Sequence, residues 1–114
     1  MTELSQNTID QLKEISIDAI NESDEYIWRY AAFFENGFGI SIICGMGTYG
    51  GNHDLFEIAV LLGDKKHFEL CYDTPITNDV IGYLTEAEVL EYAHKIRDLK
   101  EPLYVLKRDE NTAC

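Results

Sequence analysis

Side chains capable of acid–base or metal chemistry are few and widely spaced in this sequence. His53 and Asp54 are adjacent in a glycine-rich segment, and Asp73 and Asp79 lie in a polar junction further along the chain. These groups could form an oxygen-rich cation site, because Mg²⁺ and Ca²⁺ prefer carboxylate and carbonyl oxygens. Their spacing matches neither an EF-hand loop nor the HExxH pair of zinc enzymes. We therefore predict no metal site, no cofactor and no catalytic residues, and hence a protein that is not an enzyme.

The glycine-rich segment allows a second interpretation. Three glycines between residues 45 and 50 have the spacing G-x-G-x-x-G, which in dinucleotide-binding folds cradles phosphate at the start of a helix. Here residues 55–62 follow, and this continuous apolar run is typical of a strand. We therefore predict a flexible connection without a phosphate site, from which Tyr49 and His53 project as candidate binding residues.

The polar junction at residues 73–79 crowds side-chain oxygens around a single proline. We predict Asp73, Asn78 and Asp79 as binding residues there, together with Asp54 of the glycine-rich segment. An ordinary structural role is the alternative, since aspartate and threonine side chains bond readily to nearby backbone N–H groups and Asn-Asp favours a turn.

The charge balance is the most unusual property of the sequence. Twenty-one acidic residues against nine basic ones give a formal net charge of −12. A field of this sign repels nucleic acid and anionic lipid and attracts basic protein surfaces. We therefore predict a basic protein partner, no direct nucleic-acid binding and no membrane association. Solubility is the alternative explanation for the charge.

The length of 114 residues suits a single domain. We assign residues 1–107 to one acidic domain and residues 108–114 to a frayed tail. The three cysteines form no CxxC pair, and Cys44 and Cys71 lie in apolar patterns that predict buried thiols. The sequence starts without a basic and apolar leader and has no apolar run of about 20 residues, so we predict a cytoplasmic protein, in the cytoplasm of a host cell.

Apolar residues at helical spacing predict an amphipathic helix over residues 4–23, with Thr2, Ser5 or Thr8 as its N-cap. A hairpin should follow, with strands at residues 26–34 and 38–44, because Asn36-Gly37 is a strong two-residue turn signal. That turn pairs Glu35 with Phe38 and places Phe34 opposite Gly39. Neither face of this hairpin is clearly polar, so a partner, a ligand or a second copy in a homodimer could cover one of them.

A second hairpin is expected from residues 55–62 and 67–72, with a short fifth strand at residues 80–84. Thr85 and Glu88 have capping-box spacing, so a second helix should begin there and end at Pro102. A last strand at residues 103–106 would return to a sheet edge. The fold class is therefore α+β: a mainly antiparallel sheet of four to five strands, built from two hairpins, with an N-terminal and a C-terminal helix.

One stretch carries a resemblance to known sequences. The segment CYDTPITNDVIGYLT, with YGG and LFEIAVL upstream, resembles short uncharacterised proteins encoded by bacteriophages and prophages, over about residues 49–89. The resemblance implies a phage or mobile-element origin. Such proteins often bind and disable a host defence or regulatory protein.

Charge and resemblance together predict a non-enzymatic acidic binding protein. It would inhibit a host defence or nucleic-acid-processing protein by occupying its basic surface. Two alternatives remain open. One is a sponge that sequesters a nucleotide-like signalling molecule by stacking Trp28, Tyr49 and Tyr72 on it. The other is an immunity protein that neutralises a toxin.

Overall fold

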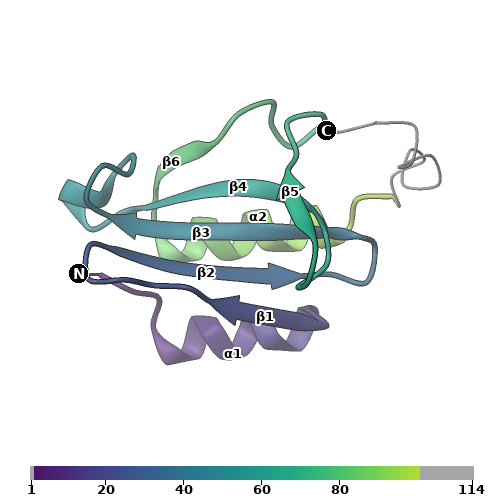
Figure 1. The fold of residues 1–114 in the computed structure, drawn as a ribbon, viewed down its shortest axis with the longest axis horizontal. Coiled ribbons are helices and arrows are strands. Elements are labelled where there is room, and N and C mark those ends of the chain that lie inside the picture. Colours follow the sequence, from purple (N-terminus) through teal and green to yellow (C-terminus); the bar gives the residue numbers. More distant parts are fainter. Residues whose placement is uncertain (1, 101–114) are drawn as a thin grey trace.

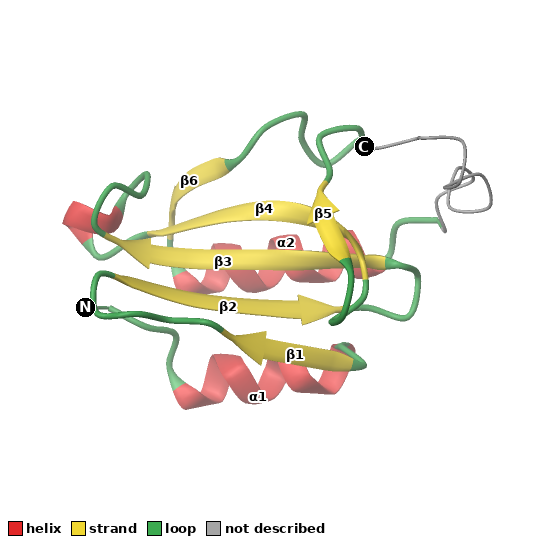
Figure 2. Ribbon diagram, in the orientation of Figure 1, coloured by secondary structure: helices red, strands yellow, loops and turns green. Residues whose placement is uncertain are grey.

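The fold is a single six-stranded sheet with two helices against one of its faces (Figures 1 and 2). The structure is a computed structural model that describes residues 2–100. The elements run along the chain as α1 (Gln6–Ile15), β1 (Asp18–Asn21), β2 (Ile27–Phe33), β3 (Phe38–Gly45), a 3-10 helix (Gly51–His53), β4 (Phe56–Gly63), β5 (Phe68–Leu70), β6 (Ile81–Leu84) and α2 (Glu86–Arg97). The α+β class predicted from the sequence is confirmed.

The strands are antiparallel and follow the order β1-β2-β3-β4, and β5 and β6 share the remaining edge of β4. Both helices lie behind the sheet in Figure 1, and the core fills the space between the two layers. Leu12 of α1 and three residues of α2, Val89, Ala93 and Ile96, are fully buried there. Inward-facing residues of β2, β3 and β4 complete this core because side chains alternate between the faces of a strand.

The prediction of a helix over residues 4–23 is wrong beyond Ile15. Ser5 is the N-cap of α1, and its hydroxyl accepts from the backbone N–H of Thr8. After α1 the chain reverses into β1, which pairs with β2 along the edge of the sheet. Isoleucine is frequent in this region, and β-branched residues favour a strand where a sheet edge is available. The sheet therefore has six strands in place of the predicted four to five.

The β2–β3 hairpin lies where the sequence placed it, but the predicted register is wrong by one residue. Phe34 and Phe38 are joined by a hydrogen bond of 2.7 Å, and the loop between them has three residues and ends at Gly37 with a φ of 92°. Phe33, and not Phe34, therefore lies opposite Gly39. A shift of one residue exchanges the two faces of a strand. The face toward the helices consists of Trp28, Tyr30, Ala32, Phe34, Ile40, Ile42 and Cys44.

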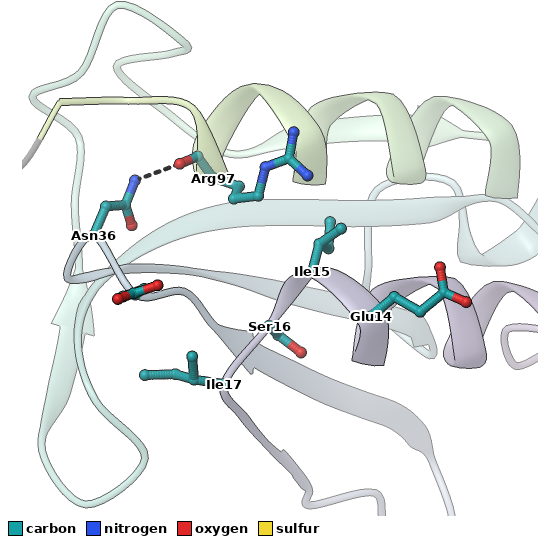
Figure 3. A pocket seen from close by; sticks show the side chains of 7 residues that line it. Glu14, Ile15, Ser16, Ile17, Asn36 and Arg97 are labelled. Carbon is teal, nitrogen blue, oxygen red and sulfur yellow. Dashed lines mark hydrogen bonds between the residues drawn. The ribbon is translucent and has the colours of Figure 1, made fainter.

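Asn36 fixes this loop to the end of α2. Its side-chain Nδ2 donates to the carbonyl oxygens of Ile96, Arg97 and Leu99, each at 2.9 Å, and its Oδ1 accepts from the N–H of Phe38 at 3.0 Å. Figure 3 shows the contact with Arg97. The last carbonyls of a helix lack partners within the helix, so this amide satisfies groups that would otherwise need water. One side chain thus joins the hairpin turn to a helix about 60 residues further along the chain.

The β4–β5 hairpin folds over the sheet face that the helices leave open (Figure 1). We call residues 64–70 of this hairpin the strap. Its Phe68 ring lies 5.1 Å from the Phe33 ring of β2, and Lys65 Nζ lies 3.5 Å from the carboxylate of Asp18 in β1. Beneath it, Phe33 and Leu61 are buried together with Ala31 in a second apolar cluster. The chain itself therefore covers part of the hairpin face for which the sequence suggested a second copy, a partner or a ligand.

Some other predictions for the second half of the chain agree with the structure. β6 pairs with β4, and the capping box between Thr85 and Glu88 is present. Cys44 is a buried free thiol, as predicted, whereas Cys71 is buried but disulfide-bonded, so the prediction of a thiol there is wrong. The predicted helix end at Pro102, the strand at residues 103–106, the domain boundary at residue 107 and the tail at residues 108–114 lie outside the described residues.

The strap gives a stability prediction. Phe68→Ala should lower the free energy of unfolding by about 1–2 kcal/mol, because it removes the ring that covers Phe33. Chemical denaturation would measure the change, with Met46→Ala as a control on an exposed loop residue, expected to change stability by less than about 0.5 kcal/mol. Equal effects of the two substitutions would contradict a stabilising role of the strap.

The Asn36 amide gives a second prediction. Asn36→Ala should destabilise the fold by about 2 kcal/mol, since the carbonyls of Arg97 and Leu99 lose this donor, while that of Ile96 keeps the N–H of Leu99. Asn36→Asp should cost more at neutral pH, because a carboxylate would face carbonyl oxygens at the negative end of a helix. That environment raises the pKa of the introduced carboxyl, so the extra cost should disappear below its ordinary pKa of about 4. Denaturation curves at pH 7 and pH 3.5 test this, and a difference between the two variants that does not change with pH would contradict it.

Candidate functional site

The glycine loop, residues 45–55, follows β3 at the end opposite to the Asn36 turn (Figure 1). Thr48 organises its first half, because its Oγ1 accepts from the N–H of Gly45 and donates to the Gly45 carbonyl oxygen. In the second half, Leu55 N–H donates to the Gly50 carbonyl oxygen at 3.0 Å. The strand predicted after the loop is present as β4. The loop thus has a defined internal hydrogen-bond network, whereas the sequence predicted a plain flexible connection.

This network leaves the loop poorly suited to phosphate. A phosphate cradle needs several free backbone N–H groups. In the glycine loop, Glu57 already supplies an anion, since its Oε1 accepts from the N–H of Tyr49 at 2.8 Å. Backbone N–H groups that donate within the protein belong to Gly45, Met46, Thr48, Tyr49, Gly51, His53, Asp54 and Leu55.

Strand β6 packs against the glycine loop. Tyr83 N–H donates to the Tyr49 carbonyl oxygen at 3.0 Å, and a Cβ on Gly82 would lie 2.4 Å from the Tyr49 Cβ. The ring centroids of His53 and Tyr83 are 6.3 Å apart. Tyr49 and Tyr83 are 60% and 58% exposed. We call Tyr49, His53 and Tyr83 the tyrosine ridge. Exposed tyrosines of this kind are typical of protein-binding surfaces.

A cavity of about 300 Å³, which we call the loop pocket, lies against the same loop. Two carboxylates, Glu25 and Asp54, line it together with the side chains of Tyr26 and Met46. Asp54 accepts a hydrogen bond from the hydroxyl of Thr2. No Lys or Arg is present among the described lining residues, so the pocket combines negative charge with apolar walls.

Cys44 also lines the loop pocket, but it is a poor nucleophile. Its side chain is 1% exposed. Burial raises the pKa of its thiol, and the carboxylate of Asp54 raises the pKa further. The reactive form of cysteine is the thiolate. The position therefore favours an inert thiol at neutral pH.

The structure brings together only half of the binding residues predicted from the sequence. Tyr49, His53 and Asp54 share the glycine loop. Asp73 lies beyond β5 and lines a different cavity, of about 440 Å³, with Phe38 at the other end of β3.

Asn78 and Asp79 lie in the connection before β6, which begins at Ile81, and the hydrogen bonds of Asp79 there are structural. Asp79 Oδ1 accepts from the N–H of Val80 at 2.7 Å, and Thr77 bonds to both backbone groups of Asp79. Within residues 2–100, no group of three or more His, Cys, Asp or Glu side chains is placed to hold a metal ion.

Four residues of this surface were missed by the sequence interpretation. Met46 lies in the predicted loop but carries no polar group to mark it. Tyr83 is recognisable only once β6 is known to pack on the loop. Glu25 and Tyr26 come from the β1–β2 connection, which reaches the loop through a hydrogen bond from Met46 N–H to the Tyr26 carbonyl oxygen at 3.0 Å.

Another cavity, of about 510 Å³, lies beside the Asn36 turn (Figure 3). Glu14, Glu35 and Arg97 line it. Two of its polar groups serve the fold, because Arg97 pairs with the neighbouring Asp98 at 3.0 Å and Asn36 holds the end of α2. The loop pocket and the tyrosine ridge are therefore the better candidate for a functional site.

Comparisons with known protein families, with curated proteins and with solved structures found no match to this chain. None of the helices in the described part of the chain is long and apolar enough to span a membrane.

The geometry of the glycine loop predicts the response to nucleotides. A ligand that binds the folded state raises the melting temperature. The backbone N–H groups of the loop already donate within the protein, so ATP, GTP, NAD and cyclic dinucleotides at about 1 mM should not bind and should leave the melting temperature unchanged. Trp28 cannot contribute a stacking surface, since it is 5% exposed and packs on Tyr30 within the core. Differential scanning fluorimetry tests this prediction. A concentration-dependent rise with any member of the panel would contradict it and would restore the nucleotide-sponge alternative.

Proposed function

We propose that this chain is a non-catalytic acidic binding protein that occupies the basic surface of a host protein. Its origin would be a bacteriophage, and its target a defence or nucleic-acid-processing protein whose groove binds phosphates. Carboxylates presented to such a groove compete with nucleic acid through the same electrostatic attraction.

The observation that carries the proposal is a concentration of exposed negative charge along one edge of the molecule. Residues 3–25 contain only one basic residue, Lys13; within this segment β1 is the edge strand of the sheet, and α1 lies behind that edge in the helix layer (Figure 1). We call the acidic residues of this segment the acidic edge, and every one of them is exposed: Glu3, Asp10, Glu14, Asp18, Glu22, Asp24 and Glu25.

Little of this charge is neutralised internally. Within residues 2–100 there are two ion pairs, and only that of Asp18 with Lys65 involves the acidic edge. Hydrogen bonds from the backbone N–H groups of Tyr26 and Ile27 lower the pKa of Asp24, so this carboxylate keeps its charge at neutral pH. The surplus charge is therefore available to attract a basic partner over a distance of about 10 Å at moderate ionic strength.

The placement of the titratable groups supports binding over catalysis. His53, His67 and His94 lie on the glycine loop, the strap and α2, and no cavity described above is lined by two of them. A catalytic constellation needs a nucleophile or base within hydrogen-bond reach of its partner. The buried thiol of Cys44 does not supply one.

The proposal predicts capture that depends on salt. The tagged chain should retain a basic protein from a bacterial lysate at about 50 mM salt and release it at about 500 mM, where the screening length falls to about 4 Å. Excess double-stranded DNA should displace the captured protein, because both would occupy the same groove. Mass spectrometry of the eluates identifies the captured protein, and binding unaffected by salt or by DNA would contradict the proposal.

A charge-matched pair of variants locates the contact. The triple variant D10N/E14Q/E22Q removes three carboxylates of the acidic edge, whereas E69Q/D73N/E91Q removes three from other surfaces. Capture should weaken more with the first variant than with the second. Equal weakening would show that the acidic edge has no special part in binding.

A further inference from the structure

We propose that the loop pocket receives an arginine side chain of the partner protein. The inference rests on the proposed function. It adds the place on this chain where the partner binds and the type of partner side chain that binds there. The acidic edge ends at Glu25, which also lines the loop pocket, so the pocket continues the surface that would attract the partner.

The size of the loop pocket suits one long side chain. Its volume of about 300 Å³ is at the lower limit of cavities that hold small organic ligands. An interface residue that fills such a pocket and loses its water there is the usual form of a binding hot spot, and arginine is enriched among hot spots.

The charge of the pocket favours a cation. Glu25 and Asp54 contribute carboxylates, and the sequence has no Lys or Arg between Arg29 and Lys65 or between Lys66 and Lys95. Strands β3, β4 and β6 and the glycine loop therefore supply no cation to compensate these carboxylates. One oxygen of Asp54 accepts from the Thr2 hydroxyl, and residues 2–100 show no hydrogen bond to the other, which can therefore accept from a donor of the partner.

The walls of the pocket favour arginine over lysine. Tyr26 and Met46 are 56% and 69% exposed, so each presents a broad apolar surface. The planar guanidinium group stacks on aromatic rings while its N–H groups bond to carboxylates in its own plane. The ammonium group of lysine is a more strongly hydrated point charge, so it gains less from contact with an aromatic ring.

A metal ion and a phosphate are the other possible occupants, and both fit less well. No group of three suitable ligands exists among residues 2–100. A phosphate would be repelled by Glu25, Asp54 and the nearby Glu57, whose carboxylate already binds the loop backbone. Both the composition of the pocket and its surroundings therefore favour an arginine.

Labelled hexa-arginine and hexa-lysine peptides test the proposal by fluorescence anisotropy with the full chain at low salt. Wild-type protein should bind hexa-arginine more tightly than hexa-lysine. The variant E25Q/D54N should bind hexa-arginine about tenfold more weakly. The control E69Q/E91Q loses the same charge from exposed positions elsewhere and should change the dissociation constant by less than about twofold. Melting temperatures of all variants show that they are folded.

A third variant separates stacking from charge. Tyr26→Ala keeps the net charge, and it should weaken binding of hexa-arginine but not of hexa-lysine. Equal weakening by E25Q/D54N and E69Q/E91Q, or no effect of Tyr26→Ala, would overturn the arginine pocket while leaving the charge-based function intact. Failure of both peptides to bind wild-type protein at low salt would instead overturn the proposed function together with the pocket.

Discussion

The structure depends on the three-residue loop between β2 and β3 and on the Asn36 amide within it. The loop length decides which side chains of β2 and β3 face the helices, because a shift of one residue would turn every buried side chain outward. The amide in turn holds the end of α2 through three carbonyl oxygens. The same loop thus sets the register of the hairpin and holds the end of α2.

The two ends of β3 have different roles because of this arrangement. At the Asn36 end, polar groups are used to join elements, and the large cavity there is lined by groups such as Arg97 that already have partners. At the other end, the glycine loop bonds internally through its backbone and turns its side chains outward. A loop that is satisfied by its own hydrogen bonds can present Tyr49, His53 and Asp54 in fixed positions, which lowers the entropy cost of binding.

The sequence predicted those features that depend on local signals. The capping box at Thr85, the apolar run of β4 and the position of the Asn-Gly turn each follow from residues close together in the chain. The errors concern features that depend on contacts between residues far apart in the sequence. Asn36-Gly37 suits a two-residue turn as well as the observed three-residue loop, and the contact of Asn36 with α2 is not visible in the local pattern. Likewise β1 forms because β2 offers an edge, and the loop pocket needs Glu25 and Tyr26 from another connection.

Some carboxylates of this protein have partners within the fold, whereas the proposed binding function needs carboxylates that remain exposed. Glu86 accepts from the backbone N–H of Ser5 at 2.7 Å and so joins the start of α1 to α2. Asp18 accepts from the N–H of Ala19 on the edge strand β1 and pairs with Lys65 of the strap. A charged side chain that occupies an edge N–H group opposes the addition of another strand. A partner at the acidic edge would therefore be held by side-chain contacts, in which the remaining free carboxylates meet its basic groups, and not by extension of the sheet.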